Sequence, residues 1–206
     1  MLEQRFLKMT KVINNNNEVH VYDENGRLIG YGGITRDSPL SNSYMRSFKH
    51  RSMHFYSTQH AITYIKARGC VGKQGGFLVQ HKLHPAELRE LYRYYPESYA
   101  FADYKGDLDR VFPYVLKAKF SQNKDLKKWL ISTGNAVLAQ IALETNNGNI
   151  VHHSEFWGLS IGPSNMDIQN PHLWHLYGNN YLGKSLMKLR EEFLKDDLRN
   201  RVKNLG

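Results

Sequence analysis

The sequence predicts an α+β fold, with a single, mainly helical domain that carries a small β-sheet. Two observations predict it. Apolar residues recur at helical spacing through most of the second half of the chain, whereas strand signals are confined to 18–31 and 150–157. With 206 residues the chain is long enough for one domain with a substantial core. We expect this domain to cover 1–206, with its core at about 18–195 and a basic helix end after it.

The first strands are expected in a β-hairpin over 18–31. Val19 and Val21 alternate with polar residues, which is typical of a strand with one buried face. The Asn-Gly pair at 25–26 is the favoured sequence for a two-residue hairpin turn. The four asparagines at 14–17 are expected to form a loop before the hairpin.

The stretch STQHAITYIKARG, residues 57–69, predicts one short helix that ends at glycine. Gln59, Thr63 and Lys66 follow the spacing i, i+4, i+7, so they share one helix face. From the residues alone this face has two readings. It is either an exposed polar stripe or the place of a reactive amine, Lys66.

A flexible glycine-rich loop, 69–76, is expected after this helix, because it lacks the Lys-Ser/Thr ending of a P-loop. A further helix is expected from 84, where proline stands in the first turn.

Helical periodicity dominates the chain from Leu108 onward. Thr133-Gly134 breaks the pattern, and Asn179 or Asn180 is the expected N-cap of the last helix. The expected helical segments are 115–120, 126–130, 137–142 and 182–193.

Composition excludes several classes of protein. The one cysteine, Cys70, permits neither an internal disulfide nor a cysteine-rich zinc site. The ten histidines form no HExxH motif, so we expect no metal and no cofactor. No apolar run approaches the length of a membrane span, and the first thirteen residues are too charged for a signal peptide, so we expect a cytoplasmic protein.

The formal net charge of +9 favours a partner that bears phosphate, because clustered cations attract polyanions. Many basic proteins bind no nucleic acid, and the charge here is scattered rather than gathered in a polybasic tail. The richness in Lys, Asn and Tyr hints at an AT-rich genome, such as that of a phage.

Five blocks of sequence, in order and at fitting separations, resemble the NADAR (YbiA-like) family. They cover most of the chain between Ser38 and Leu194. The blocks are SPLSN (38–42), YSTQHAITYIKA (56–67), AKFSQNKDLKKWLISTG (118–134), FWGLSIG (156–162) and NYLGKSLMKLR (180–190). The resemblance implies an N-glycosidase that acts either on riboflavin-pathway intermediates or on guanine bases that carry ADP-ribose.

The resemblance also implies roles for residues. Lys66 matches the family's catalytic lysine, whose unprotonated amine condenses with the electron-poor ribose C1 as a Schiff base. The five blocks are expected to line one pocket. The expected substrate-binding residues are Ser41, Asn42, His60, Trp157, Gly158, Asn180, Gly183 and Arg190.

Two departures from the family pattern concern acids. The family glutamate is Gln59 here, and the family aspartate falls on Ser154, with Glu155 one place further on. A glutamine donates hydrogen bonds but delivers no proton as an acid. Three readings stay open: Glu155 substitutes, the chain is an impaired enzyme that mainly binds, or the glutamine was introduced to trap ligand.

We therefore expect an N-glycosidase whose catalytic residues are Lys66, Gln59 and Glu155, and which removes ADP-ribose from guanine in nucleotides or DNA. The alternatives are a catalytically impaired module that binds ADP-ribose or NAD, and an N-glycosidase of riboflavin intermediates. A third alternative is a nucleic-acid-binding protein without catalysis, which would use the positive charge and the tyrosines between 92 and 104 that could stack on bases. The expected partner is an ADP-ribose-containing nucleotide or an ADP-ribosylated nucleic acid.

Overall fold

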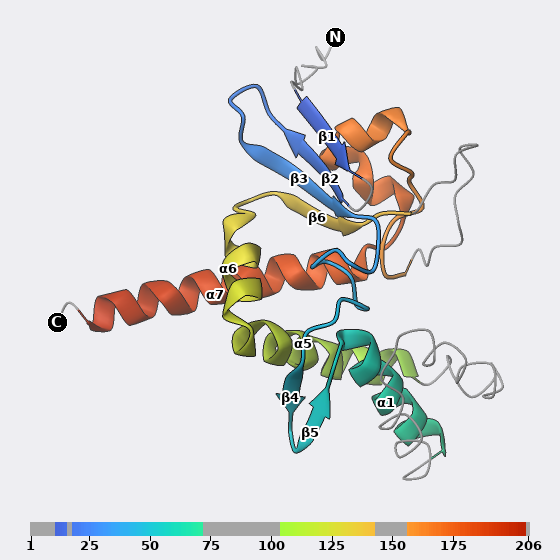
Figure 1. Cartoon of the computed structure of the whole chain (residues 1–206), viewed down its shortest axis with the longest axis vertical. Helices are drawn as coiled ribbons and strands as arrows, with labels where there is room; N and C mark the ends of the chain where they lie inside the picture. The colour runs from blue at the N-terminus through green and yellow to red at the C-terminus, as the bar shows by residue number, and fades with distance from the viewer. Residues whose placement is uncertain (1–10, 16–17, 72–103, 143–155, 205–206) are drawn as a thin grey trace. The chain divides into compact units, whose positions relative to one another are not determined.

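The computed structural model describes residues 11–15, 18–71, 104–142 and 156–204. Its chain divides into two compact units. Unit 1 combines residues 1–41 with 128–206, and unit 2 consists of residues 42–127. The fold is α+β, as the sequence predicts (Figure 1).

Unit 1 is built on a four-stranded sheet in the order β1-β2-β3-β6. Strands β1 (Lys11–Asn15), β2 (Glu18–Tyr22) and β3 (Leu28–Gly33) are antiparallel neighbours. Strand β6 (Val137–Gln140) joins β3 in parallel, with Tyr31 beside Leu138. Residues more than a hundred positions apart in sequence are therefore hydrogen-bonded neighbours in this sheet.

The predicted hairpin is confirmed, because β2 and β3 pair antiparallel across the Asn25-Gly26 turn. Gly26 has a φ of 72°, a conformation that glycine adopts without steric cost. The expected loop at 14–17 is wrong in part, since Asn14 and Asn15 continue β1 and pair with β2. Pairing with a strong neighbouring strand outweighs the low β-propensity of asparagine.

The segment 137–142, expected as a helix, contains strand β6 instead. Leu138 and Ala139 point to opposite faces of the strand, and both are fully buried. A strand buried on both faces loses its alternating pattern, so periodicity does not distinguish it from a buried helix. The other expected strand, 150–157, lies outside the described residues up to 155, and Phe156 and Trp157 form a turn.

The core of unit 1 lies on one face of the sheet. Val19 and Val21 of the hairpin pack there with Trp174, which lies in a short 3-10 helix, η2 (Pro171–Tyr177). A second 3-10 helix, η1 (Met166–Gln169), precedes it. Trp174 donates its indole N–H to the carbonyl of Ile168, so its polar atom is satisfied inside the core.

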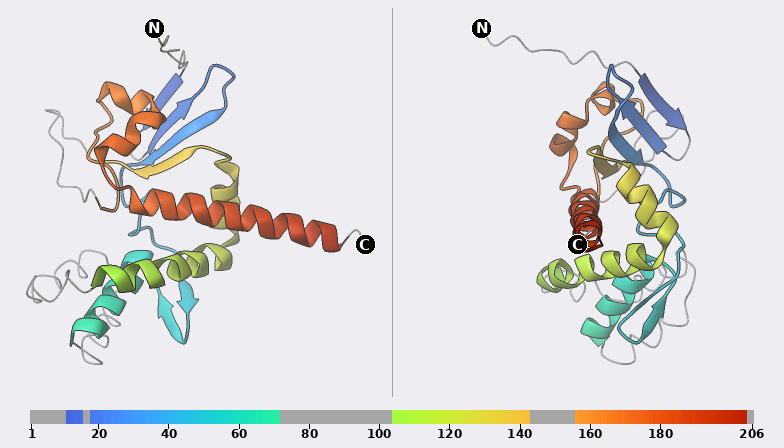
Figure 2. Two further views of the ribbon diagram at one scale, coloured as in Figure 1. Left: turned by 180° about the vertical axis from the view of Figure 1, so that it is seen from behind. Right: turned by 90° about the vertical axis from the view of Figure 1, so that its left-hand side faces the viewer.

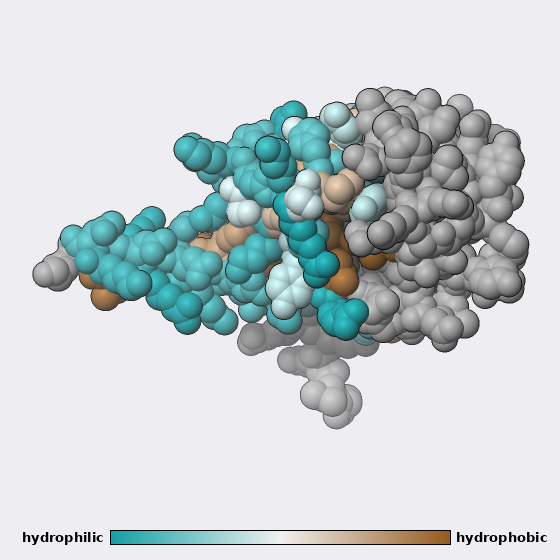
Figure 3. Space-filling view, turned by 90° about the horizontal axis from the view of Figure 1, so that it is seen from below, coloured by the Kyte–Doolittle hydropathy of each residue, from teal (hydrophilic) through white to brown (hydrophobic). Residues whose placement is uncertain are grey.

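Helix α7 (Tyr181–Lys203) packs on β6 of the same unit (Figure 2). The predicted apolar residues at i, i+4, i+7 and i+11 are confirmed as its buried face. Figure 3 shows mainly hydrophilic atoms along the helix and apolar atoms near its end, where Leu198 and Val202 are exposed. The buried residues are Leu182, Leu186, Leu189 and Phe193.

Unit 2 contains a hairpin and two helices. The hairpin consists of β4 (Phe48–His50) and β5 (Met53–Phe55), which the sequence analysis missed. Helix α1 (Thr58–Val71) packs against α5 (Tyr104–Gln122). The prediction that α1 ends at Gly69 is wrong, because the helix continues for two more residues.

Helix α6 (Lys124–Ser132) contains the predicted segment 126–130 and has Asp125 in its first turn. It ends just before Gly134, which has a φ of 57°, so the predicted break at Thr133-Gly134 is confirmed. The helix expected from 84, and the glycine-rich loop beyond Val71, lie outside the described residues. Within the described part of the chain, no helix is both long enough and apolar enough to cross a membrane.

The contact between α7 and β6 generates a stability prediction. A Cβ atom at Gly183 would lie 2.0 Å from the carbonyl oxygen of Leu138. Gly183→Ala should therefore lower the free energy of unfolding by about 1–3 kcal/mol, as overpacking does. Denaturant unfolding measures the change. Lys184→Ala, at the exposed neighbouring position, should stay within about 0.5 kcal/mol of the wild type, and equal losses would contradict the close contact.

Candidate functional site

The start of helix α1 is held by a neighbouring segment of unit 2, residues 42–46. The backbone N–H of Gln59 donates to the carbonyl of Asn42 at 2.7 Å, and the N–H of Arg46 donates to the carbonyl of Tyr56 at 2.9 Å. These two bonds fix the segment along the first turn of α1. They bring Asn42, the last residue of the SPLSN block, to the helix that carries Lys66.

The face of α1 that carries Gln59, Thr63 and Lys66 is not an exposed stripe. Thr63 is buried, and Gln59 and Lys66 are half-buried. The Gln59 side-chain amide donates to the Thr63 hydroxyl at 3.3 Å, and that hydroxyl donates to the Gln59 carbonyl at 2.8 Å. The amide of Gln59 is therefore oriented by the helix itself.

His60 has a packing role at the start of α1. It is 1% exposed, and its ring stacks on Tyr56 with 5.9 Å between centroids. Its Nδ1 accepts a hydrogen bond from the Tyr56 backbone N–H at 3.3 Å, which places the proton of the neutral ring on Nε2. The backbone N–H of His60 donates to Ser57 Oγ at 3.1 Å, so Ser57 caps the helix.

Asn42 offers an unsatisfied acceptor in unit 2. Its side chain is 6% exposed, and its Oδ1 accepts no hydrogen bond from the described residues. A buried carbonyl oxygen without a donor costs about 1–3 kcal/mol, and native proteins rarely leave one unpaired. Asn42 is thus a candidate to accept a hydrogen bond from a ligand.

Lys119 of α5 is the residue that the sequence analysis missed as a site candidate. It is 1% exposed, and its Nζ donates to the carbonyl of Tyr44 at 2.9 Å. The sequence does hold a signal, because Val115, Leu116 and Phe120 place position 119 on the apolar face of the helix. A lysine at a core position of an amphipathic helix needs a physical reason.

The surroundings of Lys119 disfavour its charged form. Burial is the main cause that lowers the pKa of its amine, to about 7, and the positive charge of Arg46 adds to the shift. Arg46 and Lys119 both approach the Tyr44 ring, at 5.4 and 5.5 Å from its centroid. Asp125 pairs with Arg46 at 3.0 Å and not with Lys119.

In unit 1, the segment 156–158 is bound to the start of α7. The N–H groups of Asn180 and Leu182 donate to the carbonyls of Gly158 and Trp157, at 3.2 and 3.1 Å. The Trp157 ring meets Tyr181 edge to face, with 5.7 Å between centroids. The structure therefore brings together Trp157, Gly158 and Asn180, which the sequence analysis placed in one site.

Asn180 is the second buried asparagine with an unsatisfied oxygen. Its Nδ2 donates to the Leu138 carbonyl at 2.8 Å, while its Oδ1 accepts no bond from the described residues. It occupies the N-cap position with a φ of 48°, but its side chain makes no capping bond. A Cβ at Gly183 would lie 2.4 Å from this Oδ1, so the Asn180 side chain packs against Gly183 where a larger residue would clash.

Arg190 has structural partners in unit 1. It is 6% exposed, and one nitrogen of its guanidinium donates to Thr133 Oγ1 at 2.8 Å and to the Ala136 carbonyl at 3.0 Å. These bonds join the closing helix to the Thr-Gly turn after α6. Its predicted role in holding a phosphate stays a prediction.

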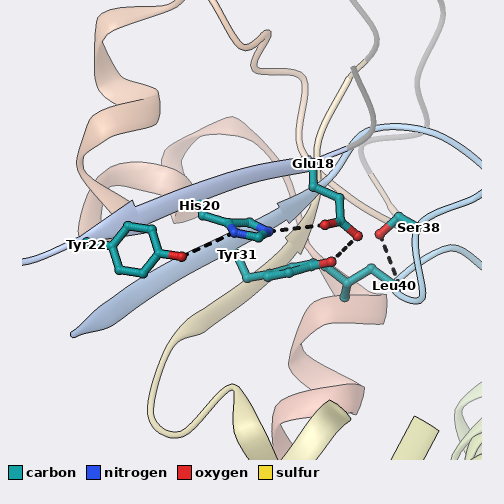
Figure 4. Close-up of polar contacts among 6 residues, drawn as sticks. All are labelled: Glu18, His20, Tyr22, Tyr31, Ser38 and Leu40. Carbon is teal, nitrogen blue, oxygen red and sulfur yellow. Dashed lines mark hydrogen bonds and ion pairs between the residues drawn. The ribbon is translucent and has the colours of Figure 1, made fainter. Parts of the chain in front are cut away.

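A further polar cluster lies on the sheet face opposite the core of unit 1 (Figure 4). The Tyr31 hydroxyl and His20 both contact the Glu18 carboxylate, His20 at 3.2 Å. Tyr22 contacts the other ring nitrogen of His20 at 3.4 Å. Burial, and then the bond to Glu18, raise the pKa of Tyr31. The cluster ties β2 to β3 side by side.

The remaining candidates complete the picture. Ser41 is buried in unit 1, with its N–H bonded to the Ser38 carbonyl at 2.8 Å, and Glu155 lies outside the described residues. Within the described residues, no group of three His, Cys, Asp or Glu side chains is arranged to hold a metal. Unit 2 holds Asn42, Gln59, His60 and Lys66, and unit 1 holds the other described candidates. That both groups line one pocket stays a prediction.

Comparison with known proteins decides the family. A family model described as the NADAR domain matches residues 32–194. The chain belongs to the NADAR family. The match covers all five blocks on which the resemblance rests, and family membership indicates an enzyme of the N-glycosidase type.

A solved structure with the same fold is the NMR structure of the E. coli protein YbiA. The two folds agree with a TM-score of 0.58, and the alignment covers 81% of this NADAR chain and 86% of YbiA. The sequences are 20% identical, so this likeness supports the fold alone. A search of the curated proteins found no match.

The burial of Lys119 predicts that stability rises with pH. The amine binds a proton more weakly in the folded chain, at a pKa of about 7, than at its ordinary value of 10.5. Between these values the unfolded chain carries more protons, so the free energy of unfolding should rise by up to about 1.4 kcal/mol per pH unit. Urea unfolding between about pH 7 and 9.5 measures this slope. Lys119→Met should remove it, and an unchanged slope in that variant would contradict the depressed pKa.

Proposed function

We propose that the chain is an N-glycosidase that removes ADP-ribose from guanine, in a nucleotide or in nucleic acid, through a lysine Schiff base. The observation that carries the proposal is Lys66, which stands in the matched NADAR region on the same face of α1 as Gln59. In the proposed reaction, the bond between C1 of the ribose and the base nitrogen breaks. The Lys66 amine then bonds to C1, and the C1–O4 bond of the ribose ring opens to give an imine. Water hydrolyses the imine to release the sugar and restore the amine.

The two buried asparagines support a sugar-binding role. The Oδ1 atoms of Asn42 and Asn180 are acceptors that no described residue satisfies. Ribose hydroxyls are donors of the right kind, and each such bond recovers the cost of leaving a buried oxygen unpaired. The positions agree with the family blocks, because the two asparagines belong to the first and the last of them.

The choice of an ADP-ribose substrate rests on charge. The net charge of +9 attracts a diphosphate, and it attracts a modified nucleic acid more strongly. An N-glycosidase of riboflavin intermediates is the alternative enzyme.

Gln59 favours a second candidate function, a module that binds ADP-ribose or NAD with little turnover. A carboxylic acid at the scissile bond contributes roughly 10²–10⁴ in rate, and the Gln59 amide, bonded to Thr63, supplies no proton. Turnover by the wild-type chain separates this module from an enzyme.

The Schiff-base role generates a prediction for Lys66. Lys66→Ala should abolish the release of ADP-ribose from ADP-ribosylguanosine. Lys66→Arg should not restore it, because a guanidinium stays protonated at neutral pH and is not a nucleophile. With the wild type, borohydride and substrate should give a covalent adduct, seen as added mass at Lys66 by mass spectrometry. Full activity of the alanine variant would refute the role.

The unsatisfied oxygen of Asn180 generates a prediction for binding, with a matched control at the neighbouring residue. Asn180→Ala should weaken the binding of ADP-ribose about tenfold or more, which corresponds to the loss of one buried hydrogen bond. Asn179 is exposed, so Asn179→Ala should change the affinity less than about twofold. Titration calorimetry measures both, and equal effects would contradict a direct contact from Asn180.

A further inference from the structure

Lys119 is a buried ionisable group that the proposed chemistry of Lys66 does not use. Its amine donates to a neutral carbonyl, that of Tyr44, and in the part of the chain that the structure describes no carboxylate pairs with it. Burying an ammonium without a counter-ion lowers the stability of the fold by several kcal/mol, because the charge loses its hydration. An apolar side chain at the same core position carries no such penalty. A perturbed lysine of this type is a marker of a functional site.

The position of Lys119 places its amine close to Gln59. The carbonyl of Tyr44 holds Nζ, and two residues earlier the carbonyl of Asn42 holds the Gln59 N–H at 2.7 Å. Two residues of chain span at most about 7 Å. The Lys119 amine and the backbone N–H of Gln59 are therefore bound to the same short segment and lie within about 13 Å of each other.

The segment that holds the Lys119 amine reaches the surface. Residues 43 and 44 are partly exposed, and residues 45–47 are exposed. The amine itself is buried, on a flexible four-carbon side chain. The unsatisfied Oδ1 of Asn42 belongs to the same segment, so one ligand has an acceptor and a donor there.

We propose that Lys119 is the general acid of the N-glycosidase reaction, in place of the carboxylic acid that position 59 lacks. The inference rests on the proposed function. In the step, the C1–N bond breaks and its electron pair stays with the leaving base. The base takes a proton from the Lys119 ammonium, which becomes a neutral amine and recovers a proton from water.

The electrostatics of Lys119 suit this role. A general acid works best when its pKa is near the working pH, and burial with the nearby Arg46 charge brings the Lys119 pKa to about 7. Gln59 keeps a complementary part, because its amide still donates a hydrogen bond to a sugar oxygen. Lys66 remains the amine that bonds to C1.

The decisive experiment compares two leaving groups. ADP-ribosylguanosine needs a proton on its leaving base, whereas an ADP-ribose conjugate of 4-nitrophenol releases a stable phenolate without one. Lys119→Met should lower kcat on the guanosine substrate by roughly 10²-fold or more, and on the nitrophenyl substrate by less than about tenfold. The control is Lys124→Met, which replaces an exposed lysine of the same unit and should leave both rates unchanged.

Two further variants distinguish a proton-donating role of Lys119 from a purely structural role. Lys119→Arg keeps a charged donor for the Tyr44 carbonyl but releases no proton at neutral pH, so it should be as slow as the methionine variant on guanosine. Gln59→Glu in the Lys119→Met background should recover about tenfold or more, because it returns a carboxylic acid to the site. The fall of wild-type kcat/KM above about pH 7 should disappear in Lys119→Met.

Several results overturn the assignment. Equal losses on the two substrates make Lys119 structural, and a borohydride adduct that survives in Lys66→Ala but not in Lys119→Met makes it the covalent amine. If the variants do not fold, NMR titration of the wild-type lysine amines decides, and a Lys119 amine with an ordinary pKa overturns the role. A wild type that cleaves neither substrate refutes the proposed function itself, and the acid role falls with it. A wild type that is active alongside an equally active Lys119→Met refutes only the role of Lys119.

Discussion

Polar atoms removed from water need partners, and this constraint organises both units. The indole of Trp174, the guanidinium of Arg190 and the amide nitrogen of Asn180 all lie in the interior with a carbonyl or hydroxyl to receive their hydrogen bonds. The bonds of Arg190 and Asn180 also join segments that are distant in sequence. Against this background the exceptions carry information, because a fold that satisfies so many buried groups leaves few unsatisfied without a reason.

The exceptions fall on residues of the NADAR blocks. Asn42 and Asn180 keep buried oxygens that no described residue satisfies, and Lys119 buries an amine without a counter-ion among the described residues. Packing alone does not account for them, since an apolar side chain of similar size stabilises a core better than an unsatisfied polar one. Under the proposed function, ligand groups supply the donors that these oxygens lack, and the stability lost in the free protein is recovered on binding.

Sequence patterns predicted those parts of the fold that depend on local chemistry. The Asn-Gly pair predicted the turn of the first hairpin, and the spacing of apolar residues predicted the buried face of α7. Strand β6 escaped prediction because its partner, β3, is about a hundred residues away and both faces of the strand are buried. Gly69 predicted the end of a helix, but α1 continues past it to Val71. A helix with other stabilising contacts tolerates the roughly 1 kcal/mol that a glycine costs.

The candidate site was predictable to the extent that its residues stand in recognisable blocks. Trp157, Gly158 and Asn180 are neighbours in the structure although 22 positions separate the second from the third. The perturbed pKa of Lys119 was not predictable in this way, because the sequence position alone does not reveal the surroundings of the side chain. Its core position on α5 was readable, but the pKa depends on Tyr44 and Arg46, which come from another segment.

Burial is also the reason that a lysine is able to take over the work of a carboxylic acid. Removal from water favours the neutral form of any ionisable group, so it raises the pKa of a carboxyl and lowers that of an amine, and both approach neutrality. The two acids differ in what they leave behind. A carboxyl that has given its proton is an anion that stabilises the electron-poor C1, whereas a lysine becomes neutral and offers no such attraction. A lysine acid therefore protonates the base but leaves the stabilisation of C1 to other groups. In the proposed mechanism the amine of Lys66 meets that need, because it bonds to C1 directly.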